Sequence, residues 1–113
     1  MALPASVRQE ISTTLIRYCE GRVPAHVRDK VRCSFGIRGS NVTLYEERPL
    51  FLRPEEWTQS PVAQFRFGKD GRWTLYCADR NSRWHEYTNI EPSANIRDLL
   101  KEVDRDPTGI FWG

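Results

Sequence analysis

Alternation of apolar and polar residues is strongest from residue 62 to residue 87, where it predicts three consecutive β-strands. The predicted strands cover residues 62–68, 72–78 and 83–87. The segments between them, 69–71 and 79–82, have lengths typical of hairpin loops and contain the turn-forming residues glycine, asparagine and aspartate. The pattern therefore predicts an antiparallel meander in this part of the chain.

The register of the first two of these strands follows from matching their apolar positions. A three-residue loop places Phe65 opposite Leu75, and Gly71 supplies the left-handed residue that such a loop needs. A two-residue loop would instead place Phe65 opposite the polar Thr74. Because a slip of one residue turns a whole strand over, the apolar match favours the three-residue loop.

A four-residue loop at 79–82 then places Cys77 opposite Trp84 and Tyr76 opposite His85. The apolar face of the meander is predicted to contain Ala63, Phe65, Phe67, Trp73, Leu75, Cys77 and Trp84. Its outer face is predicted to contain Gln64, Arg66, Thr74, Tyr76, Arg83, His85 and Tyr87. A face that only contacts water is typically rich in Lys, Glu and Thr, so the enrichment in Arg, Tyr and His points to binding.

Alternation also predicts a hairpin of strands 31–38 and 41–48. Gly39 begins its two-residue loop, as a type II′ turn requires. The predicted pairs are Ile37 with Val42 and Phe35 with Leu44 on the apolar face, and Ser34 with Tyr45 and Arg32 with Glu47 on the outer face. Cys33 falls opposite Glu46, which indicates that the apolar face ends there.

Apolar residues at spacings of three and four predict two amphipathic helices, over residues 5–21 and 94–104. Pro4 and Gly21 suit the two ends of the first helix, and Ser93 can cap the start of the second. The apolar stripes consist of Val7, Ile11, Leu15, Tyr18 and Cys19 in the first helix and Ile96, Leu99, Leu100 and Val103 in the second. Both stripes are expected to face the core.

Two further segments are apolar but lack a helical or strand period. Residues 49–60 are interrupted by prolines and are predicted to form an irregular loop. Because this loop contains Leu50, Phe51, Leu52 and Trp57, we expect it to cover an open end of the core, with a lid over a ligand as the alternative. The tail, 106–113, ends in apolar residues that we expect to dock on the body or, alternatively, to contact another protein.

These elements predict an α+β fold in a single compact domain of residues 1–113. Its five-stranded antiparallel sheet is meander-like, with the N-terminal and C-terminal helices packed on one face. The other face is then open to solvent or to a partner. An alternative is a sheet that curls towards a half-barrel.

Composition narrows the possible functions. A net charge of +2 over 113 residues is lower than that of a strongly basic nucleic-acid-binding domain. Fourteen of the seventeen basic residues are arginine, which suits phosphate or carboxylate recognition but also follows from codon usage in a GC-rich genome. No apolar run of membrane-spanning length is present, so we expect no membrane partner.

The cysteines predict a reducing, cytoplasmic environment. Cys19, Cys33 and Cys77 are odd in number and widely spaced, and we expect all three to be buried free thiols. Since His26 and His85 are the only histidines, the clustered ligands of a metal site are missing, and we expect neither a metal nor a cofactor.

The candidate binding residues are Arg32, Tyr45, Trp57, Arg66, Tyr76, Arg83, His85 and Tyr87. Arginine and tyrosine on an exposed sheet can stack on bases and contact phosphates, and they are also common anchors of protein interfaces. A simply solvated face is the third interpretation. We therefore predict a non-catalytic binding module for a protein or an RNA partner.

Two alternatives belong to other classes. In a metal-independent, toxin-like ribonuclease, His85 would be the general acid or base, and Arg83, Arg66 and Tyr87 would assist it. In a structural subunit, residues 110–112 would make intermolecular contacts. The sequence does not define the oligomeric state.

Several segments resemble the bacterial family catalogued as domain of unknown function 3024. The resemblance is carried by residues 60–66, 73–76 and 79–87, by the earlier segments 22–29 and 45–49, and by the ending, 106–113. Cys77 stands where relatives often have tryptophan, which suggests a core position that is filled by volume. The resemblance implies one compact domain and no particular activity.

Overall fold

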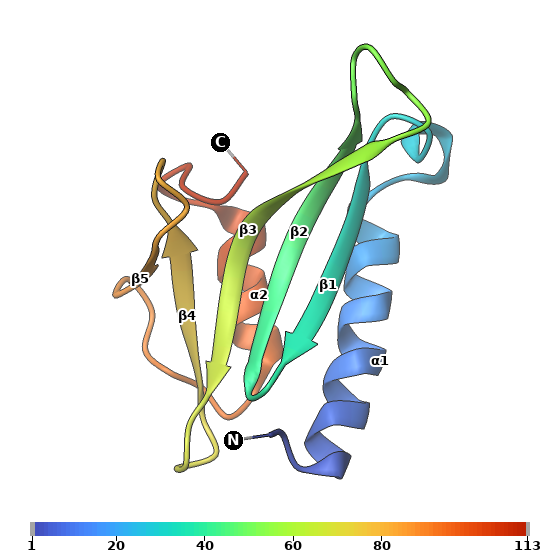
Figure 1. Ribbon diagram of the computed structural model, residues 1–113. Helices are drawn as coiled ribbons and strands as arrows, with labels where there is room; N and C mark the ends of the chain where they lie inside the picture. Colours follow the sequence, from blue (N-terminus) through green and yellow to red (C-terminus); the bar gives the residue numbers. More distant parts are fainter. Residues whose placement is uncertain (1, 113) are drawn as a thin grey trace.

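Short connections join all the strands, so each strand pairs with its neighbours in the chain (Figure 1). The computed structural model describes residues 2–112, and these form two α-helices and one antiparallel sheet with the order β1-β2-β3-β4-β5. The elements are α1 (Ala5–Arg22), the short 3₁₀ helix η1 (Ala25–Val27), β1 (Arg32–Arg38), β2 (Asn41–Pro49), β3 (Trp57–Phe67), β4 (Trp73–Ala78), β5 (Trp84–Glu86) and α2 (Ile96–Arg105). The predicted α+β fold is confirmed.

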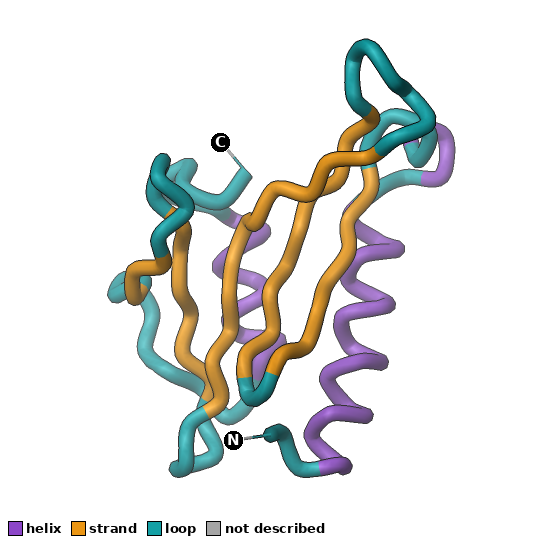
Figure 2. Tube along the Cα trace, viewed as in Figure 1, coloured by secondary structure: helices purple, strands orange, loops and turns teal. Residues whose placement is uncertain are grey.

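The core lies between the sheet and the two helices, which lie against the same side of the strands (Figure 2). α1 packs against β1, and α2 packs against β4. The fully buried side chains come from both layers: Leu15, Leu99 and Val103 from the helices, and Val42, Leu44, Phe65 and Leu75 from the strands. Each such side chain contributes about 1.5–3 kcal/mol by leaving water, so the apolar face holds the helices in place.

Two of the predicted hairpin registers are confirmed. β1 pairs with β2 through Phe35 and Leu44, and β3 pairs with β4 through Phe65 and Leu75. Gly39 and Gly71 have φ angles of 61° and 77°, which are the left-handed conformations that the two loops require. Glycine at these positions made the registers predictable.

The predicted register of the third hairpin is wrong by one residue. Cys77 pairs with His85 instead of Trp84. The reason is that the loop consists of the three residues 80–82 and not of the four residues 79–82. The N–H of Asp79 donates to the carbonyl of Arg83 at 2.9 Å, and Ser82 takes the left-handed conformation with φ of 61°. The loop therefore repeats the geometry of 69–71, with serine in the position of Gly71.

This shift reverses the faces of β5. Trp84 lies opposite Ala78 and so points to the outer side, whereas the prediction put it on the apolar face. The N–H of Tyr87 donates to the carbonyl of Leu75 at 2.8 Å, and the Tyr87 side chain is buried. Tyr87 thus belongs to the core.

The predicted irregular loop at 49–60 is shorter than expected. β2 continues to Pro49, β3 begins at Trp57, and only residues 50–56 connect them. Phe51 is 96% exposed and Leu52 is 86% exposed, so the expectation that this segment covers the core is wrong. Pro61 is accommodated inside β3 at a bulge, where the lack of a backbone N–H is tolerated.

The C-terminal segment docks on the body, as expected. The α2 cap is Asn95, whose side chain accepts from the N–H of Arg97 at 3.1 Å, and not the predicted Ser93. After α2 the chain turns at Asp106, and Phe111 enters the core beside Tyr87 with 5.0 Å between the ring centres.

Neither α1 nor α2 is long and apolar enough to cross a membrane, and no other helix in residues 2–112 is.

A pair of loop substitutions tests the equivalence of the two three-residue loops. We expect Ser82→Gly to raise the free energy of unfolding by about 0.5 kcal/mol, because glycine adopts the left-handed conformation without a Cβ penalty. Gly71→Ser should lower it by about 1 kcal/mol for the same reason. Urea denaturation measures both changes. A Ser82→Gly protein that is clearly less stable than wild type would contradict the observed loop.

Candidate functional site

The outer face consists of the strand positions that point away from α1 and α2, and it carries the candidate site. Four aromatic residues lie on it, one on each of the strands β2, β3, β4 and β5: Tyr45, Trp57, Tyr76 and Trp84. Each of these side chains is half-buried, so part of each ring is accessible. The outer face therefore offers several aromatic surfaces on one rigid sheet.

A hollow of about 490 Å³ lies in the outer face. Tyr45, Pro61 and Trp84 supply its ring-shaped walls, and Asn41, Thr43 and Gln64 supply hydrogen-bonding groups. Gly36 forms part of its floor, where an added Cβ would lie 3.7 Å from Cε2 of Tyr45. The missing side chain at Gly36 thus leaves room beside the tyrosine ring.

A chain of contacts fixes Arg66 beside this hollow. Its guanidinium carbon lies 3.8 Å from the centre of the Tyr76 ring, and its Nε donates to Oε1 of Gln64 at 2.7 Å. Gln64 in turn donates through Nε2 to Oγ1 of Thr43 at 3.0 Å. Four side chains on β4, β3 and β2 are therefore held in fixed positions before any ligand binds.

A second fixed group lies at the other end of the outer face. The guanidinium carbon of Arg32 lies 3.7 Å from the centre of the Trp57 ring. Glu47 accepts from Nε2 of Gln59 at 2.7 Å and from Oγ of Ser34 at 2.6 Å. These two hydrogen bonds hold the pKa of Glu47 below its usual range, which favours the negatively charged carboxylate at this end of the outer face.

Some of the predicted site residues lie on the outer face, and the others do not. Four of them lie on the outer face as expected: Arg32, Tyr45, Arg66 and Tyr76. Trp57 was predicted in the irregular loop 49–60, but it is the first residue of β3 and lies on the outer face as well. Arg83 was predicted on the outer face, but it precedes β5 and lies opposite Asp79, so this prediction is wrong. It is exposed, and Asp79 Oδ1 accepts from its backbone N–H at 3.0 Å. His85 occupies the register position of the inner residue Cys77, at the sheet edge, and its Nε2 lies 2.6 Å from Oδ2 of Asp79. The prediction that His85 belongs to the outer face is therefore wrong.

Tyr87 is the third site residue whose predicted position is wrong, after Arg83 and His85. Its hydroxyl donates to Oε2 of Glu102 in α2 at 2.8 Å, and its ring packs on Phe111. Burial and the hydrogen bond to Glu102 raise the pKa of Tyr87. Its role in the structure is to join β5 to α2.

The four residues proposed for a ribonuclease are not assembled into one site. Arg66 points to the outer side, Tyr87 lies in the core, and His85 pairs with Asp79 at the edge. Asp79 also accepts from the backbone N–H of Asn81 at 2.8 Å. Asp79 thus organises the loop, and its contact with His85 closes the hairpin.

Sequence reasoning missed several lining residues of the hollow. The predicted loop before Trp84 is one residue too long, and this error places Trp84 on the predicted apolar face. Asn41 and Gly36 carried no signal by themselves, because a small or polar residue is ordinary at such positions. One sequence feature could have placed Trp84 on the outer face. Asp79, Asn81 and Ser82 are residue types that favour a tight loop whose last residue has the left-handed conformation, as Ser82 does.

Comparison with known proteins identifies the family. The family model described as "Domain of unknown function (DUF3024)" matches residues 3–113, so the chain belongs to this family. No curated protein and no solved structure matches the chain. The resemblance that the sequence segments indicated is confirmed.

The buried phenol of Tyr87 predicts a loss of stability at alkaline pH. Because the pKa of Tyr87 is higher in the folded protein, the unfolded chain releases the proton first, from about pH 10, and stability falls as the pH rises further. We expect Tyr87→Phe to be less stable by about 1 kcal/mol at neutral pH and to lose less stability between about pH 8 and pH 11. Urea denaturation across this range measures both effects.

The outer-face substitution Tyr76→Phe is the matched control and should keep the wild-type pH dependence. The alkaline loss that remains in Tyr87→Phe comes from the other phenol and thiol groups whose pKa is raised in the folded protein, namely Tyr18, Cys33 and Cys77. Identical pH profiles for the wild type and Tyr87→Phe would contradict the assignment.

Proposed function

We propose that this protein is a non-catalytic binding module whose outer face binds single-stranded RNA. The observation that carries the proposal is the hollow in which two accessible rings, Tyr45 and Trp84, lie next to amide and hydroxyl groups. Single-stranded RNA presents unstacked bases that stack on aromatic side chains and form hydrogen bonds through their edges. The hollow offers both kinds of contact at one place.

The rings supply the sequence-independent part of this binding. Stacking of a base on an aromatic side chain contributes about 1–3 kcal/mol and tolerates any base, because every base has a flat π-face. Tyr45 and Trp84 are both half-buried, so their positions are fixed by the sheet while part of each ring stays accessible. A ring held in this way loses little conformational entropy on binding.

Hydrogen-bonding groups in the hollow can recognise a base edge. The amide of Asn41 has a donor and an acceptor group side by side, which suits the paired groups on adenine and similar edges. The amide of Gln64 already donates to Thr43 and accepts from Arg66, so these hydrogen bonds fix its position and occupy its polar groups. Asn41 is therefore the residue to which we assign base selection.

Arginine supplies contacts to phosphate. Arg38 is exposed at the rim of the hollow, and Arg66 lies over Tyr76 beside it. The acidic residues at strand positions of the outer face are Glu47 and Glu86. Because few arginines lie at the hollow, we expect only two or three contacts to phosphate groups. A plot of the logarithm of the binding constant against the logarithm of the salt concentration should then have a slope of about −2.

Mutation of the two rings tests the proposal. Wild type should bind a labelled single-stranded RNA of about twelve nucleotides with a Kd of about 100 μM or lower at moderate salt. Trp84→Ala and Tyr45→Ala should each weaken binding at least about fivefold, because each removes one stacking surface. Fluorescence anisotropy measures the affinity, and thermal unfolding verifies that each variant is folded.

Phe51→Ala is the control, because it removes an aromatic ring that is even more accessible, 96% exposed, and lies outside the outer face. This variant should bind RNA like the wild type. Absence of RNA binding by the wild type, or equal binding by the wild type and both ring variants, would reject the proposal.

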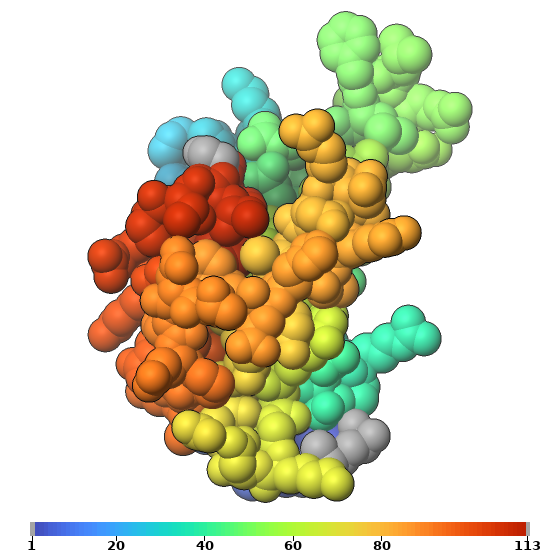
Figure 3. Space-filling model, turned by 90° about the vertical axis from the view of Figure 1, so that its left-hand side faces the viewer, coloured from blue at the N-terminus to red at the C-terminus, as the bar shows by residue number. Residues whose placement is uncertain are grey.

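A protein partner is the second candidate, and a separate observation favours it. Phe51 and Leu52 are almost fully exposed in the loop 50–56, which projects from the body of the molecule (Figure 3). An exposed apolar pair of this kind is typical of a contact with another protein. The double substitution Phe51→Asp/Leu52→Asp should abolish such a contact in a pull-down experiment and leave RNA affinity unchanged.

A further inference from the structure

Two of the three cysteines lie in contact with each other on the inner side of the sheet. Cys19 belongs to α1 and Cys33 to β1, fourteen positions later, and their Sγ atoms are 3.0 Å apart. A disulfide bond is about 2.05 Å long, so the sulfur atoms would need to approach by about 1 Å to form one. Both residues belong to regular elements that pack against each other, so the fold itself holds the two thiols together.

We propose that Cys19 and Cys33 form a redox-active dithiol, which a hydroperoxide oxidises to an intramolecular disulfide between α1 and β1. The expectation of three buried thiols is correct only for Cys77, because Cys19 and Cys33 are half-buried. This site is independent of the RNA-binding proposal, since it lies on the opposite side of the sheet from the outer face.

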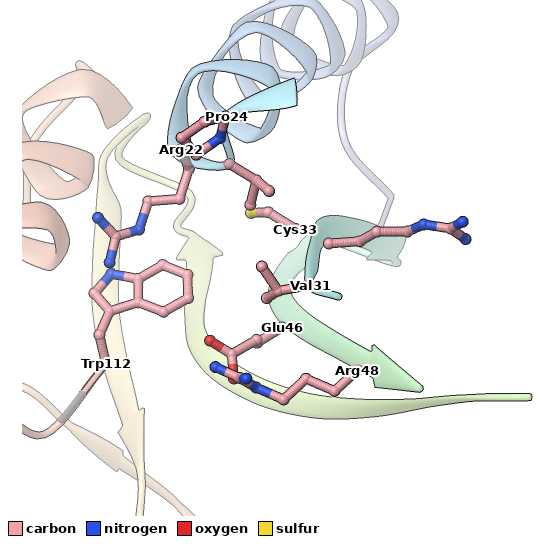
Figure 4. Close-up of a pocket in the computed structure, with 9 residues that line it drawn as sticks. Arg22, Pro24, Val31, Cys33, Glu46, Arg48 and Trp112 are labelled. Atoms are coloured by element: carbon pink, nitrogen blue, oxygen red, sulfur yellow. The ribbon is translucent and has the colours of Figure 1, made fainter. Parts of the chain in front are cut away.

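Hollows on the surface give an oxidant access to the pair. One hollow of about 250 Å³ is lined by Arg22, Cys33, Glu46 and Trp112, and Figure 4 shows the Cys33 side chain at its wall. A second hollow of about 230 Å³ is lined by both cysteines together with Arg28 and Arg32. Water occupies about 30 Å³ in the liquid, so both hollows have room for hydrogen peroxide, which is slightly larger.

The hydrogen bond between the thiols assigns their roles. The S–H of Cys33 donates to Sγ of Cys19, which lowers the pKa of the Cys19 thiol and raises that of Cys33. Cys19 is therefore the thiolate that attacks, and Cys33 is the thiol that resolves the product. Cys77 is buried beside the carbonyl of His85, and burial raises the pKa of its thiol.

The reaction balances with hydrogen peroxide as the oxidant. The Cys19 thiolate attacks one peroxide oxygen, an S–O bond forms, the O–O bond breaks, and the departing hydroxide takes up the proton that Cys19 released. Cys33 Sγ then attacks Cys19 Sγ, an S–S bond forms, the S–O bond breaks, and the second hydroxide takes the proton of Cys33. Two thiols are oxidised by two electrons, and one peroxide becomes two waters.

Thiol counting on the full chain tests the proposal. After reduction and removal of the reductant, a few equivalents of hydrogen peroxide should convert two of the three thiols to a disulfide, which peptide mapping should assign to Cys19 and Cys33. The melting temperature should rise by roughly 10 °C and return after treatment with dithiothreitol, because the bond constrains the unfolded chain. Three unreacted thiols, or a disulfide that involves Cys77, would overturn the proposal.

Single variants test the two roles. In Cys33→Ser, a sulfenic acid should accumulate on Cys19 and react with dimedone, because nothing resolves it. Cys19→Ser should react much more slowly, and Cys77→Ser should form the disulfide at the wild-type rate. A Cys19→Ser protein that forms sulfenic acid on Cys33 as fast as the Cys33→Ser protein does on Cys19 would overturn the assigned roles.

Discussion

Each strand residue must point to one side of the sheet or the other, and this constraint decides both the core and the candidate site. In the last hairpin, the decision depends on the left-handed conformation of Ser82, which shortens the loop to three residues. The resulting register sends Trp84 to the outer face and Tyr87 to the core. The backbone conformation of one exposed serine therefore decides which side chains of the next strand belong to the outer face.

The same constraint explains how far the sequence could predict this molecule. Glycine at positions 39 and 71 indicated left-handed loop residues, and apolar matching then fixed the register of four strands. Ser82 adopts the same conformation without the residue type that normally indicates it, so the register of β5 was not predictable in this way. The predicted helices, strands and fold class depend on many positions, so an error of one residue in a single register does not change them. The predicted list of site residues depends on that register, so the same error changes it.

The apolar loop 50–56 shows a second limit of pattern reading. Phe51 and Leu52 have the hydrophobicity of core residues, yet they are exposed because β2 and β3 extend to Pro49 and Trp57 and carry the loop away from both helices. Hydrophobicity predicts a tendency to be buried, but geometry decides whether a partner element is within reach. Packing against the core therefore does not explain the apolar residues of this loop.

The boundary of the core determines which cysteines can react. Cys77 lies in the middle of the apolar face, where burial favours the neutral thiol and keeps it inert. Cys33 lies opposite Glu46, at the place where the apolar face gives way to charged residues, and hollows reach both it and Cys19. The spacing of cysteines in the sequence did not suggest a pair, because the contact is made by a helix packing on a strand. The reactive dithiol is thus a consequence of where the core ends.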